Sequence, residues 1–181
     1  MNKTITIFLL ILGTSMNVQA QQHLSRQGIV EFFSYTKVEN IKATNNQAQS
    51  AIDIEKKEIV VQMLMRAFVF EKSLMQEHFN ESYIESDIYP KAIFKGEILD
   101  FEPSLEGEQT RKIKGMFAMH GVTKEIEVKT QITQTNGSYT FKGSLQLKVK
   151  DFEIKVPSLL SPNIAEDITI NFNIEFDTNE N

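Results

Sequence analysis

The chain has 181 residues, of which 41% are apolar, and 19 basic against 24 acidic side chains give it a formal net charge of −5. This length allows one domain with a substantial core, and the acidic balance argues against nucleic acid or anionic membranes as partners. The sequence contains no cysteine, which excludes disulfides, thiolate metal ligands and a cysteine nucleophile.

The first 20 residues are typical of a secretory signal peptide. Lys3 supplies a positive charge, Ile5 to Leu12 form an apolar run, and Val18-Gln19-Ala20 is a small-x-small cleavage pattern. An apolar run of roughly eight residues is far shorter than the roughly 20 that span a bilayer, so no transmembrane anchor is expected. We therefore expect an exported protein, cleaved near Ala20, with a single domain over residues 21–181. Loss of Lys3 leaves a net charge of 18 − 24 = −6.

The amino-terminal half of the mature chain is predicted to hold short strands and one helix. Residues 40–50 are polar and rich in Asn and Gln, which indicates a loop or an edge hairpin. Residues 60–70 are apolar on both faces, which predicts a central strand whose outer face is covered. The expected cover is a helix over residues 73–86, where Leu74, Met75 and Phe79 recur at helical spacing. The predicted strands of this half lie near residues 29–35, 37–43, 51–54 and 59–70.

Alternation of apolar and polar residues dominates the carboxyl-terminal half. In DITINFNIEFD, residues 167–177, every second residue from Ile168 to Phe176 is apolar, so these side chains share one face of a strand. Similar alternation occurs at residues 113–119, 122–128 and 145–149. Turn signals at Glu106-Gly107-Glu108 and Asn136-Gly137-Ser138 separate successive strands.

About eight antiparallel strands and one short helix predict an all-β, closed up-and-down barrel, because closure removes the exposed edges of a sheet. A sandwich of two sheets is the alternative. A barrel of about this size can either hold one small ligand or be filled by its own side chains. The strand pattern alone leaves both interiors open.

Three ordered motifs resemble the YceI-like family of polyisoprenoid-binding proteins. They are His78-Phe79-Asn80 leading to Tyr89-Pro90 and Phe94, then His120-Gly121-Val122-Thr123-Lys124, and finally Asp151-Phe152-Glu153-Ile154. The resemblance extends over residues 61–176. It implies a lipocalin-like barrel with an elongated apolar tunnel for a long isoprenoid chain or another lipid-like amphiphile. It also favours the periplasm as the location of the exported protein, with secretion as the alternative.

Strand alternation and this resemblance together indicate which side chains line the tunnel. Unbranched methionine side chains suit the wall of a pocket for a flexible chain, although they also fill ordinary cores. His78 and His120 are candidates for contacts with a headgroup or at the mouth of the tunnel. The predicted lining residues are Met63, Met65, Phe94, Phe117, Met119, Ile170, Phe172 and Ile174.

No catalytic or metal site is expected. His120 lies at a strand end before Gly121, which can adopt a positive φ, and no orienting carboxylate or nucleophile is recognisable near it. The histidines, including His23 near the expected mature terminus, lack the spacing of metal ligands, so no metal and no cofactor are predicted. Glu125 and Glu127 alternate with apolar residues and should point away from the interior.

We therefore expect a carrier or reservoir for a long apolar chain rather than an enzyme. The alternative is a non-catalytic structural or interaction barrel with a filled core, acting through loops such as residues 157–162, which contain Leu159 and Leu160. An enzyme acting on an isoprenoid would have only His120 and His78 to use. The sequence leaves open whether the barrel pairs as a homodimer.

Overall fold

The computed structural model describes residues 22–35, 40–155 and 167–177. The predicted signal peptide and the loop containing Leu159 and Leu160 lie outside the described residues. No helix within the described ranges is long and apolar enough to cross a membrane. The strands are β1 (Gln22–Ser34), β2 (Ile41–Asp53), β3 (Glu58–Leu64), β4 (Val69–Phe70), β5 (Lys91–Leu99), β6 (Gly107–Met119), β7 (Val122–Thr135), β8 (Ser138–Lys148) and β9 (Asp167–Phe176).

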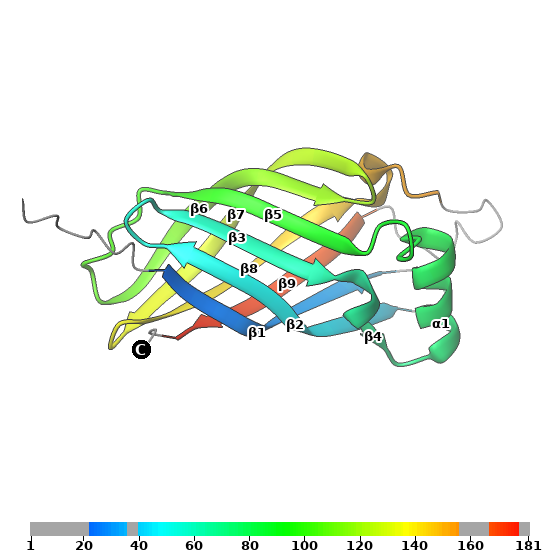
Figure 1. Ribbon diagram of the computed structural model, residues 1–181, viewed down its shortest axis with the longest axis horizontal. Helices are drawn as coiled ribbons and strands as arrows, with labels where there is room; N and C mark the ends of the chain where they lie inside the picture. The colour runs from blue at the N-terminus through cyan, green and yellow to red at the C-terminus, as the bar shows by residue number, and fades with distance from the viewer. Residues whose placement is uncertain (1–21, 36–39, 156–166, 178–181) are drawn as a thin grey trace, which may run out of the picture.

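The sheet is a closed antiparallel barrel of eight long strands, as the alternation predicts (Figure 1). Each long strand pairs with its neighbour in the chain, and β1 closes the sheet by pairing with both β2 and β9. The short strand β4 pairs with the beginning of β2, where Ala43 lies opposite Phe70. Every long strand is therefore hydrogen-bonded on both sides, which leaves none of them as a free edge.

Residues 40–50 are not a loop, and this prediction was wrong. They form most of β2, whose inward-facing residues include the buried Ala43, Asn45 and Ala48. The Asn45 side-chain amide is fully buried and donates a hydrogen bond of 3.0 Å to the carbonyl of Leu64. Small and polar inward residues produce no apolar alternation, which explains why the sequence pattern gave no strand signal here.

The strand predicted over residues 59–70 is interrupted by the 3₁₀ turn η1 (Met65–Ala67), which separates β3 from β4. Its outer face is not covered, because Val60, Leu64 and Val69 are 38%, 44% and 62% exposed. The helix consists of α1 (Ser73–His78) continued by η2 (Phe79–Tyr83), so it ends earlier than predicted. It lies beside β4 at one end of the barrel instead of on the outside of the sheet (Figure 1).

The opposite end of the barrel is filled by side chains and is called the plugged end below. Phe101, Tyr139 and Phe176 are buried there, and the rings of Phe101 and Tyr139 meet edge to face with centroids 6.1 Å apart. Phe101 lies in the loop between β5 and β6. The Gln109 amide holds this loop by donating to the carbonyls of Glu102 at 2.9 Å and Leu105 at 3.2 Å. None of these three aromatic residues lines the cavity described below.

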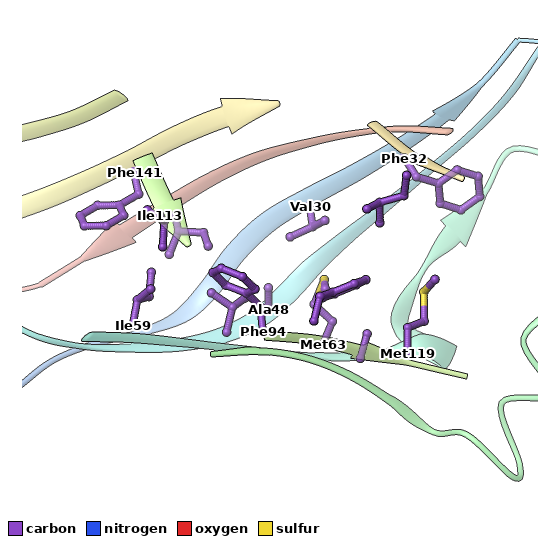
Figure 2. Packing of buried hydrophobic residues seen from close by; sticks show 14 of the residues in the cluster. Val30, Phe32, Ala48, Ile59, Met63, Phe94, Ile113, Met119 and Phe141 are labelled. Atoms are coloured by element: carbon purple, nitrogen blue, oxygen red, sulfur yellow. The ribbon is translucent and has the colours of Figure 1, made fainter. Parts of the chain in front are cut away.

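The middle of the barrel is formed by apolar side chains that converge from several strands (Figure 2). On β5 and β6 the paired residues Gly96 and Gly115 allow the two backbones to approach closely. A Cβ atom added to Gly115 would lie 2.1 Å from the carbonyl oxygen of Lys95, and one added to Gly96 would lie 2.7 Å from the ring of Phe94. Glycine at these positions lets the sheet bend and lets the Phe94 ring lie over the strand.

We predict that Gly115→Ala destabilises the barrel, because a methyl group would collide with main-chain atoms that can move only with the sheet. Overpacking of this kind costs roughly 1–3 kcal/mol of unfolding free energy or more. Urea denaturation of the purified domain measures the change. Gly28→Ala is the comparison, since its added Cβ would meet atoms no closer than 3.1 Å and should cost less. Equal stabilities of the wild type and Gly115→Ala would contradict the close approach.

Candidate functional site: an apolar cavity inside the barrel

The interior of the barrel contains a cavity of about 490 Å³, within the range of roughly 300–1,000 Å³ that is usual for ligand sites. Every one of the long strands contributes to its wall, and so does the helical segment α1–η2. Leu74 lines the cavity and is 59% exposed, so the cavity reaches the surface at the end that carries the helix. We call this opening, with Ser34, Ile41, Lys72 and Leu74 around it, the mouth.

All of the predicted tunnel residues lie on the cavity wall. Strand alternation places seven of them there, since inward and outward side chains succeed one another along each strand, whereas Met65 lies in the 3₁₀ turn η1. Met116 is an example of an outward-facing residue, because its side chain on β6 points away from the barrel interior and is 47% exposed. Whether the wall residues contact a ligand stays a prediction. The residues concerned are Met63, Met65, Phe94, Phe117, Met119, Ile170, Phe172 and Ile174.

The sequence did not identify several parts of the wall. Val30 and Phe32 of β1 line the cavity, as do Met75 and Phe79 of the helix. Met75 and Phe79 were expected to cover the outside of a strand, but they face the interior from the barrel end. Their helical spacing indicated one apolar face and could not indicate the surface against which that face packs.

Aromatic contacts hold the helical segment over the barrel end. The Phe79 ring stacks on Phe32 with centroids 5.5 Å apart and contacts Phe70 and Phe68 at 4.9 and 5.9 Å. Phe32 in turn meets Phe70 at 5.4 Å. Because these rings come from β1, β4 and the helix, the cluster joins segments that are far apart in the chain. Aromatic pairs of this kind each contribute about 0.5–1.5 kcal/mol beyond their buried area.

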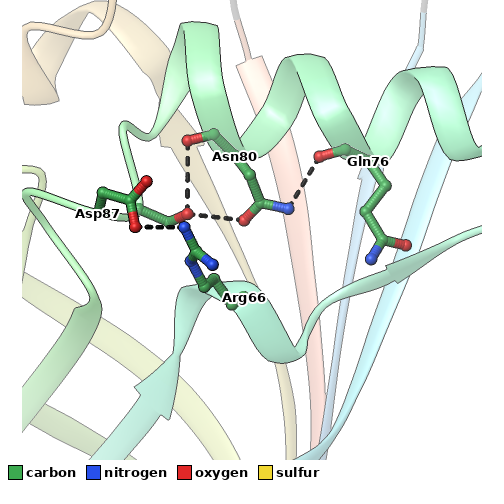
Figure 3. A network of polar contacts seen from close by, with 5 residues as sticks. Arg66, Gln76, Asn80 and Asp87 are labelled. Atoms are coloured by element: carbon green, nitrogen blue, oxygen red, sulfur yellow. Dashed lines mark hydrogen bonds and ion pairs between the residues drawn. The ribbon is translucent and has the colours of Figure 1, made fainter.

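A polar network on the other side of the helix fixes its carboxyl end (Figure 3). The Asn80 side chain donates to the carbonyl of Gln76 at 2.9 Å and accepts from the Ser86 hydroxyl at 2.9 Å. Ser86 is 1% exposed, so this hydrogen bond replaces solvation that the hydroxyl has lost. Arg66 of η1 pairs with Asp87 in the following loop. These contacts tie the end of η2 to the barrel.

His120 joins three loops at the same end of the barrel. Its Nδ1 lies 2.9 Å from the carbonyl oxygen of Phe152, its Nε2 lies 3.2 Å from a carboxylate oxygen of Glu85, and its ring contacts Tyr89 at 4.5 Å. The side chain is 9% exposed. Both polar partners are acceptors, so both contacts are hydrogen bonds only when the ring carries a proton on each nitrogen.

This geometry corrects one sequence interpretation and confirms another. A carboxylate does lie beside His120, but it comes from Glu85, too far away in the chain for a motif to reveal. The backbone is as expected, because His120 and Gly121 have φ values of 51° and 75° and form a tight two-residue hairpin turn. His120 does not line the cavity, so the geometry places it in an anchoring position rather than at the mouth.

The remaining predicted polar candidates are widely separated. His78 lines the cavity near the mouth, whereas His23 is buried near the plugged end, where it meets the Tyr139 ring at 5.1 Å. His23 is therefore packed into the barrel, although it lies near the expected mature terminus. No group of three or more His, Asp or Glu side chains in the described part of the chain could hold a metal ion. Glu125 and Glu127 point outward, as predicted, and pair with Lys114 and Lys112 on the outer surface.

Together, the fold and this site define a small β-barrel protein with an apolar internal cavity that opens at one end. A family model described as the YceI-like domain matches residues 14–176, and the chain belongs to this family. No curated protein sequence matches the chain.

Solved structures of low sequence identity share the fold. A polyisoprenoid-binding domain from Saccharophagus degradans, implicated in plant cell wall breakdown, superimposes with a TM-score of 0.76 at 11% identity, over 88% of this chain and 99% of that domain. BcnA of Burkholderia cenocepacia superimposes with a TM-score of 0.68 at 17% identity, over 82% of this chain and 95% of BcnA. The YceI protein of Campylobacter jejuni superimposes with a TM-score of 0.64 at 17% identity, over 79% of this chain and 88% of that protein.

We predict that His120→Asn lowers the free energy of unfolding by about 1–2 kcal/mol, because it leaves the Phe152 carbonyl without its partner. Asparagine tolerates the positive φ of this turn, so the substitution removes the contacts without straining the backbone. Glu85→Gln should cost less than about 1 kcal/mol, since Glu85 is 47% exposed.

A double-mutant cycle with these two variants, followed by urea denaturation, measures the interaction between the side chains. Strictly additive effects would contradict a direct contact. An unchanged stability of His120→Asn would contradict the anchoring role itself.

Proposed function

We propose that this protein binds a long apolar chain, an isoprenoid or a similar amphiphile, inside its barrel and acts as a carrier or reservoir. The observation that carries the proposal is the cavity of about 490 Å³, whose wall is almost wholly aliphatic, aromatic and methionine side chains. Membership of the YceI-like family supports it, as does the fold shared with a domain that binds polyisoprenoid. The signal-like amino terminus supports export, with the periplasm as the proposed location.

The energetics favour a chain rather than a compact polar ligand. Each buried methylene contributes about 0.8 kcal/mol, so ten of them contribute about 8 kcal/mol before the costs of association and ordering are subtracted. The alternative function, a barrel with a filled core acting through its loops, requires an interior without such a cavity. A catalytic function gains no support from His120, because its ring contacts lie outside the cavity wall.

Native mass spectrometry of the mature protein purified from its own host tests the proposal. We expect an added mass that denaturing extraction releases as a long-chain isoprenoid or another amphiphile. A bare protein mass that persists after polyprenyl lipids are offered to the purified protein would contradict it. The bound molecule, once released, also identifies the ligand.

Filling the cavity should prevent binding without unfolding the barrel. Leu145 lies on β8 opposite Ile170 and lines the cavity, so we predict that Leu145→Trp places an indole where the chain would lie. If the indole displaces only two methylenes of the chain from the cavity, about 1.6 kcal/mol of binding free energy is lost, which is more than a tenfold loss of affinity. Displacement of a fluorescent apolar probe measures the affinity.

Leu64→Trp is the matched control, because Leu64 points outward from β3 and is 44% exposed. We expect this variant to bind chains as the wild type does. Equal affinities of Leu145→Trp and Leu64→Trp would show that the chain does not occupy the cavity at Leu145.

A further inference from the structure

The cavity ends inside the barrel, before the plugged end. On β6 and β8 the last wall residues in that direction are Ile113 and Phe141, which we call the floor. Figure 2 shows both at the opposite end of the apolar cluster from Phe32 and Met119. Phe141 is fully buried, and the ring of Phe176 meets it edge to face with centroids 5.2 Å apart.

Beyond the floor the barrel is filled by a layer of buried side chains. They come from five strands and from the β5–β6 loop, and each is 5% exposed or less. None of them lines the cavity. A chain that passed the floor would have to displace at least one of them, and unpacking a buried aromatic residue costs more free energy than burying one methylene gains. The residues of this layer are Ile52, Ile98, Phe101, Ile132, Tyr139 and Phe176.

The wall of the cavity covers six residue steps on each of three strands. It extends from Ile113 to Met119 on β6, from Phe141 to Leu147 on β8 and from Ile168 to Ile174 on β9. At about 3.3 Å per residue and a strand tilt of about 40°, this is roughly 15 Å along the barrel axis. An extended hydrocarbon advances about 1.3 Å per carbon, since its bonds are about 1.5 Å long, so the wall accommodates roughly 12 main-chain carbons.

The volume of the cavity gives a separate upper limit. A methylene group packed at the density of a protein interior takes up roughly 25 Å³, so the cavity of about 490 Å³ holds at most roughly 20 carbons. An isoprene unit contributes four carbons to the main chain and one methyl branch. Three units therefore match the length of the wall, and four units match the volume.

We propose that the barrel selects its ligand by chain length, with a preference for chains of three or four isoprene units or straight chains of about 12–16 carbons. This inference rests on the proposed function, because it assigns the size of the chain held in the same cavity. Each methylene that enters the cavity raises the affinity about fourfold, whereas further carbons remain outside the mouth and add little. Ile113 and Phe141 set the limit.

The experiment measures affinity against chain length at a constant headgroup. Saturated fatty acids of every chain length from octanoate to eicosanoate compete with the neutral probe N-phenyl-1-naphthylamine for the purified, delipidated protein, below their micellar concentrations. We expect the affinity to rise about fourfold with each added carbon up to dodecanoate. It should become constant between dodecanoate and hexadecanoate.

Two variants near the floor should move this limit in opposite directions. Phe141→Val removes ring volume at the deep end, so the rise should continue for about two more carbons. Val128 lines the cavity and lies opposite Ile113, so Val128→Phe should end the rise about two carbons earlier. Phe33→Val is the matched control, because Phe33 is a phenylalanine of β1 that does not line the cavity. It should leave the limit unchanged.

Urea denaturation checks that each variant is folded, and Val128→Phe keeps the test decisive if loss of the Phe141 ring unfolds the barrel. A rise in affinity that continues unchanged to eicosanoate would overturn the selection by length while supporting the cavity as a chain-binding site. A limit that is the same in the wild type and in every folded floor variant would overturn the assignment to the floor. Binding of neither the probe nor any fatty acid would overturn the proposed function and this inference together.

Discussion

The pairing of β1 with both β2 and β9 is the interaction on which the rest of the structure depends. Once these pairs close the sheet, every second residue of each long strand faces a common interior, and the backbone hydrogen bonds are satisfied on both sides. An open sheet of the same strands would expose two edges and would enclose no volume. The cavity is therefore a consequence of closure together with the size of the inward side chains.

The two ends of the barrel differ because different side chains occupy them. At the plugged end, Phe101 returns from the β5–β6 loop and packs against Tyr139. At the other end, Phe79 approaches from the helix and leaves space beside it, so the cavity continues to the mouth. The contacts that hold the helix, from the Phe32 ring to the Asn80–Ser86 hydrogen bond, therefore also determine the shape of the opening. The cavity is therefore open only toward the end of the barrel that carries the helix, among the described residues.

The sequence predicted the carboxyl-terminal strands well and the amino-terminal ones poorly, for a physical reason. The inward residues of β9, from Ile168 to Ile174, are large and apolar, so their alternation is visible in the sequence. The inward residues of β2 include Asn45 and Ala48, which are small or polar and give no such signal. Asn45 is accommodated only because the Leu64 carbonyl lies within hydrogen-bonding distance. That partner belongs to another strand and is brought there by folding.

The sequence by itself determined the fold class, the family and the inward face of most strands, since each depends on local periodicity or on short motifs. It separated Met119, which lines the cavity, from the outward-facing Glu125 and Glu127. Only the tertiary structure decided that the interior holds an open cavity, because the free volume depends on how side chains from all the strands fit together. It also decided the position of the helix and the pairing of His120 with Glu85. These contacts join residues that are distant in the chain, and a local sequence pattern cannot predict which distant residues come together on folding.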